Sequence, residues 1–151
     1  MGLPFSIALT MIIGHFFYYQ KKALNFLQNS ILFMALTLLT TNLMTIAAMN
    51  INKLKLTDDP YLFLAFPLYR DVILPIIVLI FVNAFILSDS LKIKSTLLAA
   101  YLFSSLAIDY IHIYFGVIGY TKWQIAFPVL FHSAYIASSL FIAQIITKKE
   151  Q

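Results

Sequence analysis

A few ionisable side chains stand out because they lie within long apolar stretches of this 151-residue sequence. Asp109 and His112, in the run DYIH, are spaced so that both can lie on one face of a helix. His132 lies in the next apolar stretch, and Arg70, in the preceding one, is the only arginine. A carboxylate within a membrane costs about 2.5–3.5 kcal/mol at the centre, so it normally has a partner or lines a wet cavity.

These residue types fit three arrangements. In the first, Arg70 and Asp109 form an ion pair that only fixes the register of two helices. In the second, they belong to a ligand or ion site open to the outside of the membrane. In the third, Arg70 extends to the lipid headgroups, with Asp71 as its neighbour. The predicted ligand or ion-pair cluster comprises Arg70, Asp109, His112, His132 and Tyr135.

The same side chains are candidates for metal binding and for catalysis. Two histidines and a carboxylate can hold zinc with one open position, and histidine can relay protons near neutral pH. Ser133 follows His132 directly, but helix neighbours point about 100° apart, so these two do not form a nucleophile and base pair. We therefore predict no catalytic residue, no bound metal and no cofactor.

The composition predicts a membrane protein. Hydrophobic residues make up 62% of the chain and charged residues 11%, against about 45–50% and 25% in soluble domains. The net charge of +4 comes from lysines in short pairs between apolar blocks, a pattern that sets membrane orientation and does not indicate nucleic-acid binding. Because the chain has no cysteine, disulfides and thiolate sites are excluded.

Five apolar blocks are long enough, or nearly so, to cross about 30 Å of hydrocarbon as helices. They cover residues 3–19, 28–49, 61–88, 95–117 and 124–147. The blocks predict an all-α integral membrane fold, a single compact antiparallel bundle that includes the whole chain. It has five spans, or four if the short first block does not cross. A β-barrel would need short alternating strands, which the sequence lacks.

The lysines predict the orientation. Three basic pairs follow the first, third and fifth blocks: Lys21 and Lys22, Lys92 and Lys94, and Lys148 and Lys149. The alternate loops carry Lys53, Lys55 and Lys122, and the first two are offset by Asp58 and Asp59. Under the positive-inside rule the three pairs are cytoplasmic, so the N-terminus lies outside and the C-terminus inside.

Helix length places the polar residues near the outer surface. The third block is about eight residues longer than a span needs, so Arg70 lies at the outer edge of the hydrocarbon, with a helix break or tilt expected at Pro67. Counted at 1.5 Å per residue, Asp109 lies about 9 Å, His112 about 5 Å and His132 about 6 Å below that edge.

Small and hydroxylated residues form stripes that indicate close helix packing. The predicted packing residues are Thr37, Thr41, Thr45, Ser105 and Ser139. Gly116 and Gly119 are expected to cap or bend the fourth helix at its end. Tyr120 and Trp123, on either side of the following short loop, are expected to be anchors at the membrane surface.

The run IDYIHIYFGVIGYTKW, residues 108–123, resembles a group of small uncharacterised multi-pass membrane proteins of spore-forming Gram-positive bacteria. The matching positions are Asp109, Tyr110, Gly116, Tyr120, Trp123 and the final Lys148 and Lys149. The resemblance covers about a tenth of the chain. It implies a bacterial membrane setting and no mechanism.

From these patterns we expect a non-enzymatic protein of the bacterial cell membrane. It would bind a membrane partner or a small ligand through an outer-facing polar cavity, with the lipid bilayer around it and a homo-oligomer as one form of partner. The alternatives are a small transporter or channel subunit and, less favoured, a membrane-embedded enzyme that modifies lipids. A transporter would need polar groups that continue toward the cytoplasm.

Overall fold

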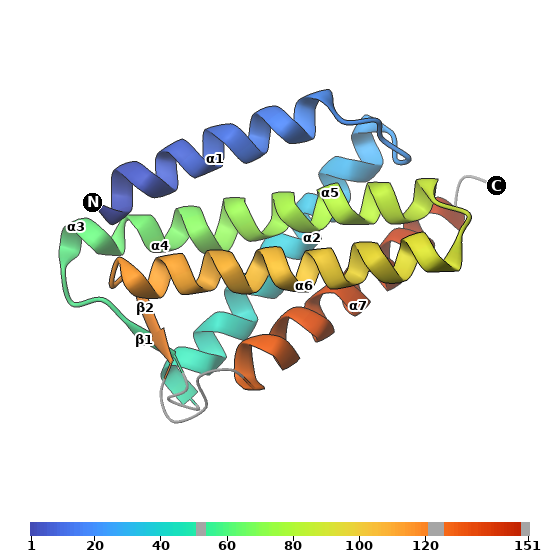
Figure 1. Cartoon of the computed structure of the whole chain (residues 1–151). Coiled ribbons are helices and arrows are strands. Elements are labelled where there is room, and N and C mark those ends of the chain that lie inside the picture. The colour runs from blue at the N-terminus through green and yellow to red at the C-terminus, as the bar shows by residue number, and fades with distance from the viewer. Residues whose placement is uncertain (51–53, 121–125, 149–151) are drawn as a thin grey trace.

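The computed structural model describes residues 1–50, 54–120 and 126–148 of the chain. Its five long helices are each apolar enough to cross a membrane, which confirms the predicted all-α class and the predicted number of helices. They are α1 (Gly2–Tyr19), α2 (Phe26–Thr45), the third helix Pro60–Leu87 that ends in α5 (Leu74–Leu87), α6 (Leu91–Tyr114) and α7 (Ala126–Lys148) (Figure 1). Lys53, Lys122, Trp123 and Lys149, which enter the predictions above, lie outside the described residues.

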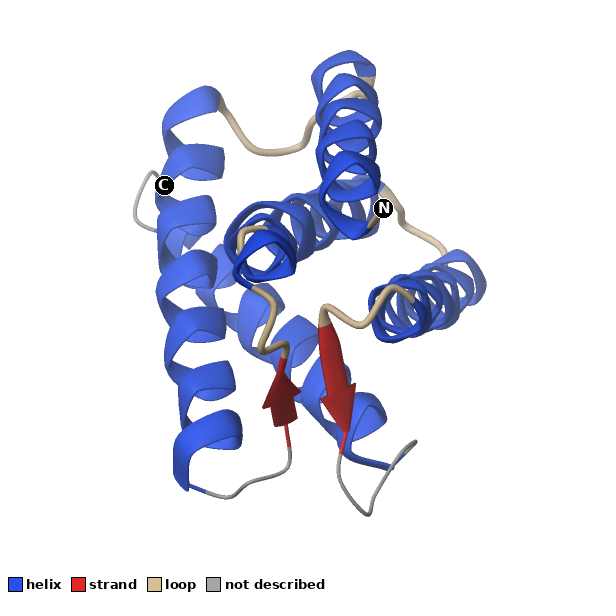
Figure 2. Ribbon diagram, turned by 90° about the vertical axis from the view of Figure 1, so that its left-hand side faces the viewer, coloured by secondary structure: helices blue, strands red, loops and turns tan. Residues whose placement is uncertain are grey.

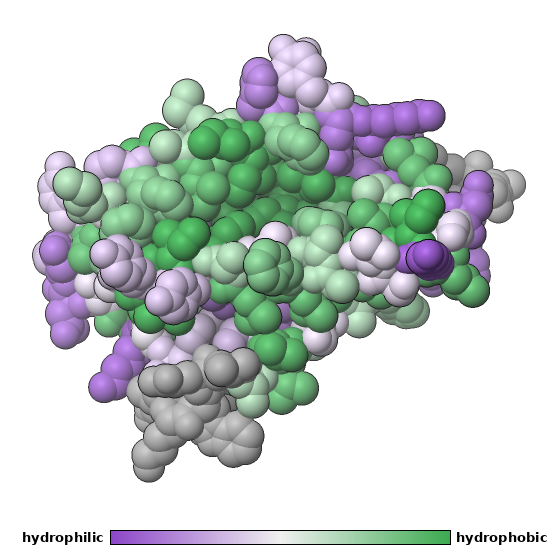
Figure 3. Space-filling view, in the orientation of Figure 1, coloured by the Kyte–Doolittle hydropathy of each residue, from purple (hydrophilic) through white to green (hydrophobic). Residues whose placement is uncertain are grey.

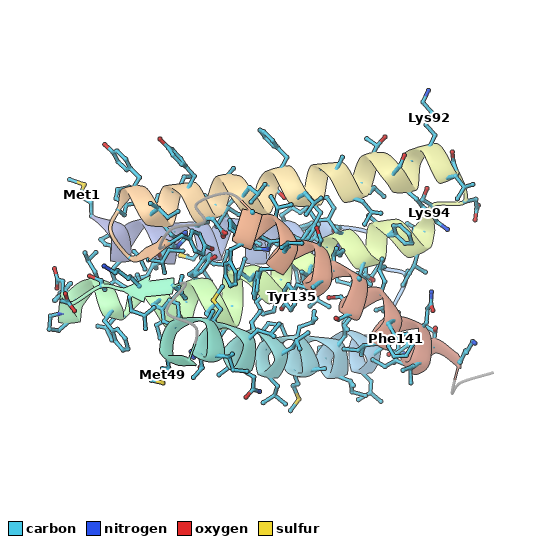
Figure 4. The ribbon with its side chains drawn as sticks, turned by 90° about the horizontal axis from the view of Figure 1, so that it is seen from below. Met1, Met49, Lys92, Lys94, Tyr135 and Phe141 are labelled. Atoms are coloured by element: carbon cyan, nitrogen blue, oxygen red, sulfur yellow. The ribbon has the colours of Figure 1, made fainter. Side chains whose placement is uncertain are left out.

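The helices are arranged with the lysines at one end. Figure 4 shows Met1 and Met49 at one end of the bundle and Lys92 and Lys94 at the other. We call the second end the lysine end; its described basic residues are Lys21, Lys22, Lys92, Lys94 and Lys148. Figure 3 shows a broad apolar band between the two ends, with hydrophilic residues gathered toward the ends. This distribution is typical of a helical bundle surrounded by lipid.

Helix α6 is shifted from its predicted bounds, 95–117. It begins at Leu91 and ends at Tyr114, because lysines near a helix terminus are compatible with helical backbone and Gly116 stops the helix. Gly116 has a φ of 71°, in the left-handed region that glycine adopts without strain. Its N–H donates to the Ile113 carbonyl, and the Val117 N–H donates to the His112 carbonyl, both at 2.9 Å. These are the bonds of a Schellman motif, so the expected cap at Gly116 is confirmed.

A small sheet at the opposite end was not expected from the sequence. Strand β1 (Leu54–Leu56) pairs antiparallel with β2 (Ile118–Tyr120), and Leu54 lies opposite Tyr120. Figure 2 shows the two strands side by side, and we call this end of the bundle the sheet end. Runs of three residues give almost no periodicity signal, so their pairing is not readable from sequence. The sheet holds the chain that follows α6 close to that helix's end.

The third helix contains irregular turns in place of the expected break at Pro67. It consists of α3 (Pro60–Phe63), α4 (Ala65–Pro67), the π-helical segment η2 (Leu68–Ile73) and α5. Pro67 is itself helical, with φ −58° and ψ −39°, so the prediction of a break there is wrong. The short interruption lies at Leu64. Proline fixes φ near the helical value, and wide turns let neighbouring backbone groups find other partners.

Pro75 lacks the N–H that would bond to the Asp71 carbonyl in a regular α-helix. The Thr37 hydroxyl of α2 donates to that carbonyl over 3.2 Å. Helix α2 thus supplies a donor to this carbonyl from across the interface with the third helix.

Fully buried Asn83 joins three segments at the lysine end. Its Oδ1 accepts bonds from the N–H groups of Ala23 and Leu24, at 2.9 and 3.0 Å. Its Nδ2 donates to Asn29 Oδ1 and to the Leu79 carbonyl, both at 2.8 Å. Asn83 therefore fixes the loop between α1 and α2 against α5.

Replacing Asn83 with leucine should lower the free energy of unfolding by about 2–3 kcal/mol, because the Leu24 N–H is left buried without an acceptor. Unfolding in detergent micelles measures the change. Asn42→Leu is the control, since Asn42 is exposed and bonds only within its own helix, to the Leu38 carbonyl. Equal midpoints for the two variants would contradict a structural role of Asn83.

Candidate functional site

Asp109 is the centre of a buried cluster at the sheet end of the bundle. It projects inward from α6 and is 2% exposed. Tyr69 donates its hydroxyl to Asp109 Oδ1. Tyr120 donates to Oδ2 over 2.8 Å, and His132 Nε2 lies 3.0 Å from the same oxygen. Both carboxylate oxygens therefore have hydrogen-bond partners, which offsets much of the cost of burying the group.

The partners of Asp109 come from three other elements. Tyr69 belongs to η2, Tyr120 to β2 and His132 to α7. Each is held by its own backbone element, so the carboxylate links four parts of the chain that are distant in sequence. We call Asp109, Tyr69, Tyr120 and His132 the aspartate cluster.

Tyr120 lies on the strand, outside the candidate spans, and turns its hydroxyl inward. Burial, together with the negative charge of Asp109, raises the pKa of Tyr120 above its ordinary value of 10.0. The phenol therefore keeps its proton at physiological pH and remains a donor to the carboxylate. The expectation that Tyr120 is a membrane-surface anchor is wrong, because its hydroxyl is bonded to Asp109.

His112 shares the buried face of α6 with Asp109, as the spacing predicts, but it bonds elsewhere. Its Nδ1 lies 2.8 Å from the Ile108 carbonyl, which can only accept, so Nδ1 carries the proton. Nε2 lies 3.2 Å from the Ser6 hydroxyl, which also lies 3.0 Å from the Gly2 carbonyl as a donor to it. The ring also lies 4.4 Å from that of Tyr69. His112 thus attaches the first turns of α1 to the bundle, beside the aspartate cluster.

The expected Arg70–Asp109 ion pair is wrong. Arg70 Nε and Nη2 donate to Asp71 Oδ1 and Oδ2 at 2.6 and 2.8 Å, and the Thr41 hydroxyl donates to the same Asp71 Oδ1 at 2.9 Å. The two charged side chains remain 19% and 25% exposed. The reason lies in η2: its turns direct Tyr69 into the core, while Arg70 and Asp71 stay half-buried at the side.

Tyr135 also lies outside the aspartate cluster, although the sequence placed it there. Its hydroxyl donates to the Leu36 carbonyl of α2 over 3.2 Å. Figure 4 shows it near the middle of the bundle. Its position on α7 thus connects that helix to α2 and not to Asp109.

The residues expected to line an open cavity form a closed cluster. Asp109, His112 and His132 are 2%, 1% and 0% exposed. Within the described ranges, no group of three or more histidine, aspartate or glutamate side chains could hold a metal ion. His132 Nδ1 and the Tyr101 hydroxyl are buried and have no hydrogen-bond partner among the described residues. No hydroxyl nucleophile is therefore bonded to this histidine.

Four of the five predicted packing residues lie at helix interfaces or inside the bundle, and the fifth is exposed. Thr37 and Thr41 contact Asp71 across the interface of α2 with η2, and Ser105 and Ser139 are fully buried inside the bundle. Thr45 is exposed, and its hydroxyl bonds within α2 to the Thr41 carbonyl, so its predicted packing role is wrong.

Tyr69 and Tyr120 are the site residues that sequence reasoning missed. Tyr69 stands next to Arg70, in a block whose outer boundary falls near both residues. That depth was a usable signal, because a tyrosine hydroxyl close to a buried carboxylate is a natural donor. Tyr120 gave no such signal, since its position depends on the pairing of β2 with β1.

A second feature is an apolar groove of about 620 Å³ between α1, α2 and α5. Its walls include Gly14, Phe17, Phe33, Met34 and Leu79, and Lys22 lies at its edge. The groove is separate from the aspartate cluster and lies nearer the lysine end.

Comparison with known proteins gives no matching family model, no similar curated protein and no similar solved structure.

Asp109→Asn should lower the free energy of unfolding by about 2–4 kcal/mol, because its amide nitrogen would face groups that are themselves donors. Asp89→Asn, in the exposed loop before α6, is the matched control. Thermal unfolding of the purified protein in detergent measures both. A midpoint for Asp109→Asn equal to that of the control would show that the cluster does not hold the bundle together.

Double-mutant cycles distinguish the observed ion pair from the expected one. Arg70→Gln and Asp71→Asn should show a coupling energy of about 0.5–1 kcal/mol, the value for a half-exposed ion pair. Arg70→Gln and Asp109→Asn should be additive. Coupling between Arg70 and Asp109 that exceeds the coupling with Asp71 would overturn the observed pairing.

Proposed function

We propose that this chain is a non-enzymatic, multi-pass protein of a bacterial cytoplasmic membrane that binds a membrane-embedded partner or a small apolar ligand. The groove between α1, α2 and α5 is the observation that carries the proposal. It replaces the polar cavity as the binding site, because Asp109 and its neighbours are closed off.

The groove is suited to an apolar occupant within the membrane. Phe17, Phe33, Met34 and Leu79 line it from three different helices. A concave apolar site with a few polar groups is the usual form of a ligand pocket. An occupant would add contacts to the exposed parts of these side chains, above all to Met34, which is 65% exposed, so dispersion favours occupancy.

The proposed setting and orientation rest on charge. The lysine end carries Lys21, Lys22, Lys92, Lys94 and Lys148, and its assignment to the cytoplasm follows the positive-inside rule. The N-terminus would then lie outside. The bacterial setting is supported by the resemblance of residues 108–123 to membrane proteins of spore-forming bacteria.

A second candidate is a small transporter or channel subunit. It is favoured by buried polar side chains that continue from Asp109 toward the lysine end through Tyr101, Tyr135 and Ser139. The Tyr101 hydroxyl and His132 Nδ1, which have no partner in the part of the chain that the structure describes, lie along this series. The binding function is preferred because both oxygens of Asp109 are engaged by hydrogen bonds within the bundle.

Photocrosslinking from the groove tests the binding proposal. A photoreactive benzophenone residue in place of Met34, which lines the groove and is 65% exposed, should give a discrete adduct in native membranes. The matched control is Phe103 on α6, which is 78% exposed and lies on another surface. It should give only the unresolved adducts of bulk lipid.

The adduct is then identified by mass, as a lipid, a second copy of the chain or another polypeptide. Indistinguishable adducts at Met34 and Phe103 would mean that the groove binds nothing specifically, and the proposed function would fail.

A further inference from the structure

The groove has one charged edge. Lys22, between α1 and α2, places its Nζ 5.0 Å from the centre of the Phe17 ring and 2.9 Å from the Tyr18 carbonyl, to which it donates. An ammonium group has three donors, and this bond uses one of them. Lys21 is its exposed neighbour. A positive charge thus lies where the apolar groove reaches the lysine end.

The start of α2 adds to the positive potential at this edge. Helix α2 begins at Phe26, which itself lines the groove. The N-terminus of a helix carries a partial positive charge that favours a nearby anion. Together, the N-terminus of α2 and the Lys22 ammonium group make this edge of the groove favourable for a negatively charged group. The apolar walls of the groove are favourable for a hydrocarbon chain.

Helix α1 leaves the groove open along its second half. Near its start it is attached to the bundle through Ser6 and His112, whereas a Cβ added at Gly14 would meet no atom within 4 Å. The space beside Gly14 is therefore wide enough for a chain of methylene groups to pass between α1 and α2.

We propose that the groove binds an anionic phospholipid of the surrounding bilayer, with one acyl chain along Phe17, Phe33 and Leu79 and the phosphate at Lys22. The inference rests on the binding function proposed above and names the occupant. A basic edge beside a gap between membrane helices is a recognised arrangement for lipid headgroups. A second copy of the chain or a foreign helix would fill the apolar part but leaves the Lys22 charge without a partner.

The test uses the full-length protein purified in neutral detergent, with equal amounts of phosphatidylglycerol and phosphatidylcholine added. Native mass spectrometry counts the bound lipids of each kind. Gly14→Leu fills the groove, and it replaces a helix-interior glycine with a better helix former, so folding should be preserved. Lys22→Gln removes the charge, and Lys92→Gln removes an exposed lysine at the same end that does not line the groove.

The wild-type protein and Lys92→Gln should retain phosphatidylglycerol in preference to phosphatidylcholine. Gly14→Leu should reduce bound lipid at least tenfold without lowering the unfolding midpoint. Lys22→Gln should still bind lipid, but its preference for the anionic headgroup should fall about fivefold, the factor that corresponds to one lysine near a membrane surface.

Undiminished binding of phosphatidylglycerol to Gly14→Leu would overturn the proposal, and so would a headgroup preference that Lys22→Gln leaves unchanged. Dimers or a co-purified polypeptide that Gly14→Leu removes would also overturn it, since another occupant would fill the groove. In that case the Met34 adduct would be a polypeptide, and the proposed binding function would stand while the lipid assignment fails.

Discussion

The buried carboxylate of Asp109 is the constraint on which the arrangement of the bundle depends. Asp109 is 2% exposed, so the partners of this group have to come from the chain. Tyr69, Tyr120 and His132 supply the donors from three elements. The pairing of β1 with β2 places Tyr120 beside the end of α6, the helix that carries Asp109.

The helices could be predicted from the sequence because apolar length is a strong signal. Five blocks of sufficient hydropathy became five helices, and Gly116 ended α6 where glycine is favoured. The inward face of Asp109 was also predictable, since helix periodicity determines which side of α6 carries it. These are properties of single helices, which sequence patterns describe well.

The pairing of side chains between helices could not be predicted in the same way. Arg70 and Asp109 are complementary in charge and close in depth, but the π-helical turns of η2 rotate Tyr69 inward and leave Arg70 beside Asp71. One extra residue per turn changes which neighbour faces the core, and no local pattern signals it. The groove likewise depends on how α1 lies across α2 and α5, a relation between helices that periodicity does not describe.

The sequence separation within the aspartate cluster has a consequence for how the protein assembles. The residues of the cluster stand at positions 69, 109, 120 and 132, and the neighbouring bond from Ser6 to His112 spans 106 residues. Helix α1 is synthesised before α6, so its contact on α6 is made only after three further helices. Until α7 has been synthesised with His132, Asp109 lacks one of its donors. The cluster therefore closes only after α7 has been synthesised, and a chain that stalls before α7 would keep the Asp109 carboxylate incompletely bonded.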